Sequence, residues 1–145
     1  MTQFFSGMRQ RGTSMIEVLV TMIIVALGLL GYAGLMTVSI KDNNSAYFRT
    51  QATLLSYDII ERVRMNKILA KAGNFNIALG GAVPNGANIQ LVELSSWRAN
   101  IAQSLPSGAG SVSVDGSGKV TIVIQWIEMI KGSATPTNFT TQSVI

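Results

Sequence analysis

The sequence contains no histidine and no cysteine among its 145 residues. It therefore lacks the commonest general base, a thiol nucleophile, a disulfide framework and the usual ligands of transition metals. Acidic residues are scarce, and only Asp58 and Glu61 lie close together, beside two arginines. Such a group is typical of a salt-bridged helix face rather than of a catalytic carboxylate pair. We expect no enzymatic activity, no cofactor and no metal ion.

Charged residues make up only 12% of the chain and leave a net charge of +4. Two of the cations, Arg9 and Arg11, lie in a short segment near the N-terminus. The remaining excess is small, and it forms no basic stripe interleaved with aromatic residues, the pattern that favours binding to nucleic acid. We therefore do not expect nucleic acid as the main partner.

One long segment, Val18 to Ile40, carries no charged residue at all. As a helix that rises about 1.5 Å per residue it would extend about 34 Å, enough to cross a hydrocarbon core of about 30 Å. Arginines precede this segment, whereas the charges of Lys41 and Asp42 after it cancel each other. Because the more positive flank of a membrane helix usually stays inside the cell, the N-terminus is expected in the cytoplasm. The sequence predicts a single-pass membrane protein whose larger part lies outside the cytoplasm.

Glu17 stands directly before this apolar segment. An ionised side chain near hydrocarbon costs about 2.5 to 3.5 kcal/mol on insertion scales, so we expect a functional reason for it. Two ordinary interpretations compete: a secretory signal cleaved near Gly31-Tyr32-Ala33, and a plain membrane anchor in which Glu17 has no role. Neither accounts for the spacing between Gly12 and Glu17.

The hexapeptide Gly12-Thr13-Ser14-Met15-Ile16-Glu17, with its basic leader and its apolar helix, resembles the class III signal of type IV prepilins and pseudopilins. The resemblance implies that a prepilin peptidase removes residues 1–12 by cutting after Gly12 and then methylates the amine of Thr13. The apolar helix is retained. Thr13 differs from the phenylalanine that is most common at this position in major pilins.

Physical reasoning suggests what Glu17 does after processing. In a staggered filament it would lie near the N-terminal amine of Thr13 in the next subunit. At 4 Å and an effective dielectric constant of about 20, such a pair contributes on the order of 4 kcal/mol before desolvation. The alternative is a carboxylate that snorkels or interacts with the helix dipole.

Three glycines, Gly28, Gly31 and Gly34, recur at every third position of the apolar segment. Small residues let membrane helices approach closely, so this spacing favours helix packing. There are two alternatives: the glycines allow the helix to unwind locally during assembly, or they have no special role.

From Asn43 the pattern becomes that of an amphipathic helix, which we expect to end near Gly73-Asn74. Asp58 and Arg62 are spaced to form an ion pair on it. Its predicted apolar stripe consists of Phe48, Ala52, Leu55, Ile59 and Val63, widened by Leu54, Tyr57 and Ile60.

The remainder, residues 73–145, is predicted to be a globular head. We expect a loop over 73–88, a helix over 94–105 that begins at a serine cap, and a final edge strand over 138–145 after a turn over 132–136. Alternating residues at 111–115 and 119–128 flank Gly116-Ser117-Gly118 and predict a β-hairpin. The fold class is therefore α+β: a long helix with a membrane half (13–40) and an amphipathic half (43–72), carrying a small antiparallel sheet.

Further segments resemble the PilV group of minor type IV pilins: Gly28-Leu29-Leu30-Gly31, residues 51–58, residues 62–66 and the strand around Trp126. The resemblance covers residues 9–67 well and the head only in outline. It implies a minor pilin in the inner membrane, with its head in the periplasm, that later reaches the pilus at the cell surface. Other minor pilins, the major pilin and a tip adhesin would be its partners in adhesion, twitching motility or DNA uptake.

Two further interpretations remain open. A minor pseudopilin of a type II secretion system shares the signal and the helix. A membrane-tethered periplasmic binding domain that never polymerises would share only the anchor.

Overall fold

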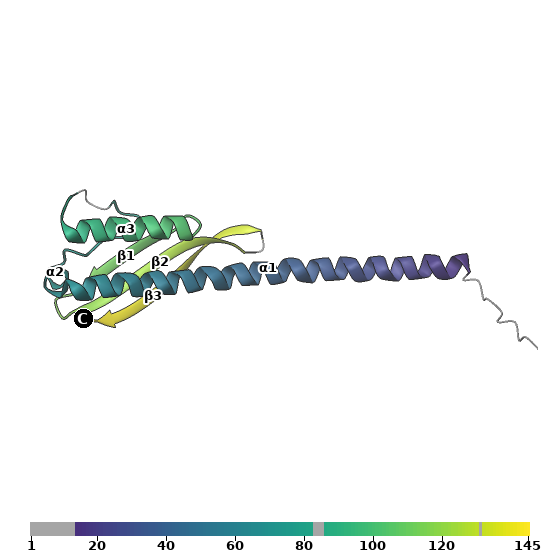
Figure 1. Cartoon of the computed structure of the whole chain (residues 1–145), viewed down its shortest axis with the longest axis horizontal. Helices are drawn as coiled ribbons and strands as arrows, with labels where there is room; N and C mark the ends of the chain where they lie inside the picture. Colours follow the sequence, from purple (N-terminus) through teal and green to yellow (C-terminus); the bar gives the residue numbers. More distant parts are fainter. Residues whose placement is uncertain (1–13, 83–85, 131) are drawn as a thin grey trace, which may run out of the picture. The chain divides into compact units, whose positions relative to one another are not determined.

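The computed structural model describes residues 14–82, 86–130 and 132–145 (Figure 1). Three helices, α1 (Met15–Met65), α2 (Lys67–Lys71) and α3 (Ile89–Ser104), precede three strands, β1 (Ala109–Val114), β2 (Lys119–Ile130) and β3 (Ser133–Val144). The strands form one antiparallel sheet in the order β1-β2-β3. The predicted α+β class, a long N-terminal helix with a small antiparallel sheet, is confirmed.

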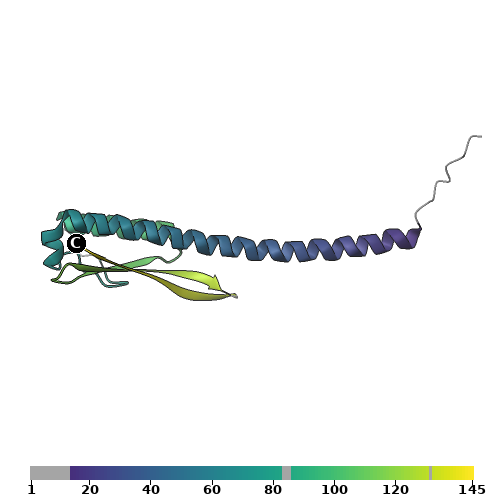
Figure 2. The same ribbon diagram turned by 90° about the horizontal axis from the view of Figure 1, so that it is seen from below.

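The chain divides into two compact units, one up to Asp42 and the other from Asn43 to Ile145. The described part of the first unit is the apolar half of α1. The second unit contains the later turns of α1 and all the other elements. Figure 2 shows the sheet lying against one side of these later turns.

The later turns of α1 contribute one face to the hydrophobic core. Its buried residues are Ala52, Ser56, Ile59, Ile60 and Val63, and Phe48 and Leu55 pack against them. The predicted widening by Leu54 and Tyr57 is wrong, since these side chains are 57% and 60% exposed. At 100° per residue both lie outside the arc of the buried positions. Ser56 lies inside that arc and is buried, and its hydroxyl is satisfied because it donates to the Ala52 carbonyl at 2.8 Å.

Helix α1 ends where Asn66 interrupts the helical hydrogen bonding. The Asn66 side chain donates to the Arg62 carbonyl at 3.0 Å, which satisfies one of the free carbonyls at the helix end. The short helix α2 follows, and Gly73 then adopts a positive φ of 81°. This is the left-handed conformation that commonly terminates helices, at the glycine where the sequence predicts the stop.

Helix α3 begins at Ile89, earlier than the sequence predicts, and ends at Ser104. Asn88 is its N-cap residue, with an extended backbone, and its carbonyl accepts from the N–H groups of Leu91 and Val92. The predicted serine cap is therefore wrong: Ser95 lies inside the helix and its hydroxyl donates to the Val92 carbonyl at 2.9 Å. Pro106 follows directly after the helix C-cap, Leu105.

The predicted β-hairpin is present as β1 and β2, with Val112 opposite Ile122 and Val114 opposite Val120. Strand β3 starts at Ser133 rather than at Asn138, because Gly132 with a φ of 82° makes a tight turn where a longer one was expected. The sheet and α3 bury two tryptophans, Trp97 and Trp126, in the core.

Candidate functional site

The proposed processing site, Gly12 and Thr13, and the leader, residues 1–12, lie outside the described residues. The described chain begins at Ser14, directly before α1.

Ser14 and Glu17 form the start of α1. The Glu17 N–H lies 2.9 Å from the Ser14 carbonyl and 3.3 Å from the Ser14 hydroxyl oxygen. The contact with the hydroxyl is one half of a capping box, in which serine accepts from the N–H three residues later. This role of Ser14 was not predicted, although a Ser-x-x-Glu pattern before an apolar run is its usual signal.

The Glu17 side chain lies in the first turn of α1, where the positive end of the helix dipole favours a carboxylate. It is exposed, and it forms no ion pair with any residue that the structure describes. A dipole accounts for a few tenths to about 1 kcal/mol, less than the cost of holding a charge beside hydrocarbon. The charge of Glu17 thus lacks a full counterpart within the described chain.

The apolar half of α1 is bare, that is, no other part of the described chain covers it. Its most apolar window has a mean hydropathy of 2.4, and none of that window is buried. Every residue from Ser14 to Asn44 is exposed. Burial of apolar surface contributes about 25 cal/mol per Å², so this helix needs a lipid or protein environment to cover it.

Gly28, Gly31 and Gly34 all lie in this bare half. A Cβ atom built on any of them meets nothing within 4 Å. Packing within the described chain therefore does not require glycine at these positions, although each glycine costs about 1 kcal/mol of helix propensity relative to alanine. Their role in packing against other helices stays a prediction.

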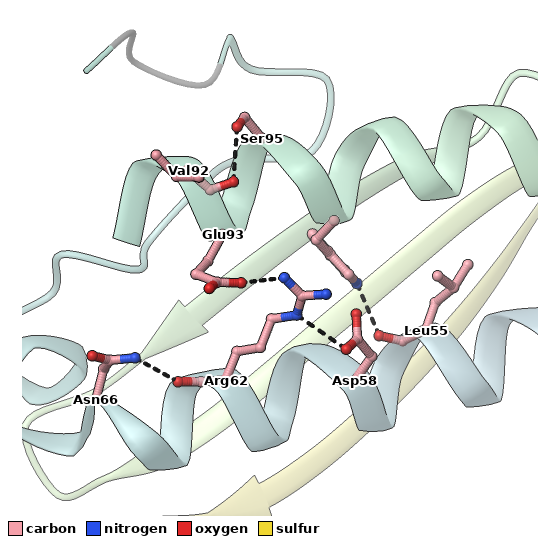
Figure 3. Close-up of polar contacts among 8 residues, drawn as sticks. Leu55, Asp58, Arg62, Asn66, Val92, Glu93 and Ser95 are labelled. Atoms are coloured by element: carbon pink, nitrogen blue, oxygen red, sulfur yellow. Dashed lines mark hydrogen bonds and ion pairs between the residues drawn. The ribbon is translucent and has the colours of Figure 1, made fainter. Parts of the chain in front are cut away.

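In the second unit, charged residues that form ion pairs link α1 to α3. Arg62 lies between Asp58, 3.0 Å away on the same helix, and Glu93 on α3 (Figure 3). The hydrogen bond that Arg62 Nε donates to Asp58 is the largest of the causes that raise the pKa of Arg62. The pair of Asp58 and Arg62 was predicted, whereas nothing in the local pattern indicates that Glu93 joins it.

Hydrogen bonds from two residues of α3 fix this helix to α1 and to the loop before it. The Trp97 indole N–H donates to the Leu55 carbonyl at 2.8 Å, and the Arg98 guanidinium donates to the carbonyls of Gly81 and Ala78. Partial burial lowers the pKa of Arg98. Within the described ranges no group of three or more acidic, histidine or cysteine side chains is placed to hold a metal ion.

Residues 7–33 match the family model of the prokaryotic N-terminal methylation motif. The chain therefore carries a class III signal of the kind found in type IV pilin-like proteins of pili and pseudopili, over residues 7–33. The motif implies processing by a prepilin peptidase and assembly with other pilins, and together with the apolar helix it fits anchoring in the inner membrane. The comparisons with curated proteins and with solved structures gave no match.

Proposed function

We propose that this protein is a minor type IV pilin of the PilV kind, which takes part in priming pilus assembly at the tip and so in adhesion, twitching motility or DNA uptake. The observation that carries the proposal is the bare apolar half of α1, which has Glu17 in its first turn and overlaps the methylation motif over residues 15–33. An apolar helix exposed on every side suits two environments in turn, lipid before assembly and a bundle of like helices afterwards.

The proposed roles of the signal residues follow from their chemistry. The peptidase cuts after Gly12 and methylates Thr13, and the head lies in the periplasm until the subunit enters the filament. Glu17 then pairs with the amine of Thr13 in a neighbouring subunit, which supplies the missing counterpart for its charge. Gly28, Gly31 and Gly34 allow the helices to approach. No catalysis, cofactor or metal ion is needed, and the partners are other minor pilins, the major pilin and a tip adhesin.

Processing is tested by mass spectrometry of the protein extracted from membranes. We expect a methylated Thr13 as the first residue, and an uncut chain in Gly12→Leu. Gly7→Leu is the matched control, because it places the same side chain in the leader away from the cut, and it should be processed normally. An intact Met1 in the parent, or a new start near Gly34, would contradict the pilin interpretation.

Assembly is tested by Glu17→Ala, which we expect to be cleaved and methylated but poorly incorporated into filaments. The reduction should be about tenfold or more if the pair contributes at least about 1.4 kcal/mol net. Glu61→Ala is the control, since Glu61 lies on the same helix in an exposed pair with Arg64. The measurement is the amount of protein in sheared surface filaments, and equal incorporation of Glu17→Ala and parent would exclude the assembly role.

Pseudopilins share the matched methylation motif with pilins. A minor pseudopilin of a type II secretion system is therefore the second candidate. Deletion strains distinguish the two. Loss of surface pili with intact secretion of exoproteins supports the pilin, and the reverse supports the pseudopilin. Normal piliation and normal secretion would favour a tethered binding domain.

A further inference from the structure

The two outer edges of the sheet differ in whether their outward backbone groups are hydrogen-bonded within the chain. At the β1 edge the chain covers itself: Val112 exchanges two backbone hydrogen bonds with Ile77, at 2.9 and 3.0 Å. Next to it, the Asn76 side chain accepts from the Val114 N–H at 2.6 Å and donates to the Val114 carbonyl at 3.3 Å. The outward backbone groups of Val112 and Val114 are therefore satisfied by the chain itself.

At the other edge, the direction of each backbone group on β3 follows from one contact. The Ile145 N–H donates to the Gly118 carbonyl at 2.9 Å, so Ile145 faces β2. Successive residues of a strand alternate in direction, and the register with β2 is continuous from Ser133 to Val144. The N–H and C=O groups that point away from the sheet thus belong to Asn138, Thr140, Gln142 and Val144.

A second contact supports this assignment from the other side of β2. The Lys119 carbonyl accepts from the Asp115 N–H, so the odd-numbered residues of β2 face β1 and the even-numbered ones face β3. None of the four outward residues of β3 has a backbone hydrogen bond on its outer side among the residues that the structure describes.

From Asn138 onward the β3 edge also lacks the features that usually prevent strand addition. Strand β3 contains no charged residue and no bulge. Its one proline, Pro136, occupies an outward position, where the missing N–H leaves the pairing with β2 intact. The free edge suited to pairing is therefore the stretch Asn138–Val144, which begins after this proline.

We propose that Asn138–Val144 is a docking edge that receives an extended, proline-free segment of another protein as a further strand of the sheet. Backbone hydrogen bonds supply the affinity in this mode of recognition. The protein uses its own Asn76 and Ile77 to cover the edge of β1 and leaves the opposite edge, on the longer strand β3, to a partner.

A second copy of this chain, added antiparallel through its own β3, is a poorer occupant. Ser45 contacts Glu128, opposite the start of β3, and Arg64 contacts Ser143 near its end, so the later turns of α1 run in the same direction as β3. Antiparallel pairing of two β3 strands would set the two α1 helices in opposite directions. Chains anchored in one membrane enter a filament from the same side, with their α1 helices in the same direction. Antiparallel pairing of two β3 strands is therefore excluded, a step that rests on the proposed function.

Residue-resolved amide hydrogen exchange of the full chain tests the proposal. In detergent micelles the N–H groups of Asn138, Thr140, Gln142 and Val144 should exchange fast, and those of Phe139, Thr141 and Ser143 slowly. In filaments, both sets should be protected, with at least about a tenfold slowing of the outward set. A methylated, assembled protein whose outward amides still exchange fast would overturn the docking edge and leave the proposed function standing.

Thr140→Pro and Thr140→Val form the matched pair of variants. The proline removes an outward N–H, as Pro136 already does, whereas the valine keeps the backbone. We expect Thr140→Pro, but not Thr140→Val, to lose the added protection, with Thr141 and Ser143 still protected. If the proline disturbs the sheet, Gln142→Lys replaces it, because it adds a charge beside the edge without altering the backbone.

A photo-crosslinker at Gln142 in assembled protein identifies the occupant. An adduct with an extended segment of another protein, lost in Thr140→Pro, supports the proposal. An adduct with β3 of a second copy, or no adduct at all, overturns it.

Discussion

Asp115 in the turn between β1 and β2 is the residue whose ionisation the structure links most clearly to stability. Its Oδ1 accepts from the Ser117 hydroxyl at 2.6 Å and from the Lys119 N–H at 2.9 Å. These hydrogen bonds, that from Ser117 first, hold the pKa of Asp115 below its ordinary value of 3.8. Since the folded state favours the carboxylate, its contribution is complete above the ordinary pKa and is lost as the pH falls through the lower, folded value.

We therefore predict that Asp115→Asn lowers the free energy of unfolding at pH 7 and that this difference shrinks on acidification below about pH 4. Urea unfolding of the full chain in detergent micelles at several pH values is the measurement. Ser117→Ala should reduce the same pH dependence, because it removes the largest cause of the shift. A difference between Asp115→Asn and parent that stays constant from pH 7 to pH 2.5 would contradict the assignment.

Other residue-level properties depend on partners that are distant in the sequence. Glu93 pairs with Arg62, and Glu128 is buried although it is a carboxylate. Glu128 accepts from the Trp126 indole at 2.8 Å and lies 3.3 Å from the Ser45 hydroxyl. Periodicity identifies which face of an element is apolar, as it did for Ala52 and Ile59, but it contains no information on which polar side chain of another element lies opposite.

The contact between β1 and α3 depends on a glycine. A Cβ atom at Gly110 would lie 2.5 Å from the Trp97 ring and 2.6 Å from the Ile101 side chain. Both of these are fully buried, so they have little room to shift.

We predict that Gly110→Ala destabilises the protein by about 1 to 3 kcal/mol, the usual cost of overpacking a core. Gly116→Ala is the control, because a Cβ atom there meets nothing within 4 Å, and it should change stability by less than about 0.5 kcal/mol. Thermal or urea unfolding of both variants compares them. Equal effects at the two glycines would mean that α3 does not rest closely on β1.

At the scale of elements, local signals predicted what local chemistry controls. The hairpin follows from alternation around Gly116-Ser117-Gly118, and the helix stop follows from Gly73. The starts of α3 and β3 were placed too late, because they are set by tertiary pairing. Glu93 in the added turn of α3 binds Arg62, and the residues before Asn138 extend the ladder with β2.

For the molecule as a whole, the sequence predicted the signal best, because a peptidase and a membrane act on a short linear segment. Gly12, Thr13 and Glu17 need no tertiary structure for that prediction. The matched residues 7–33 include all three positions, whereas the cut after Gly12 and the methylation of Thr13 stay predictions. The surface that covers the apolar half of α1 belongs to lipid or to other chains. Neither this sequence nor its fold contains those atoms, so the roles of Glu17 and of the three glycines remain predictions.

The division at Asp42 leads to a prediction about autonomous folding. The buried residues of the hydrophobic core in the described chain lie between Ala52 and Trp126, with Phe48, Phe139 and Ile145 packed against them, and the described residues before Asn43 contribute none. Deleting residues 1–42 therefore removes bare apolar surface without opening a cavity. We predict that the fragment from Asn43 to Ile145 is soluble without detergent and unfolds cooperatively, whereas the full chain requires detergent or lipid.

A shorter fragment from Leu54 is the control for this experiment. It lacks Phe48 and Ala52 of the core face and the Ser45 hydroxyl beside Glu128, so it should be less stable by several kcal/mol. Near-ultraviolet circular dichroism, which reports the buried Trp97 and Trp126, and urea unfolding compare the two fragments. If the fragment from Asn43 were unfolded, the apolar half of α1 would have to stabilise the second unit. Its folding would instead show that this half is free to exchange lipid for other subunits without affecting the core.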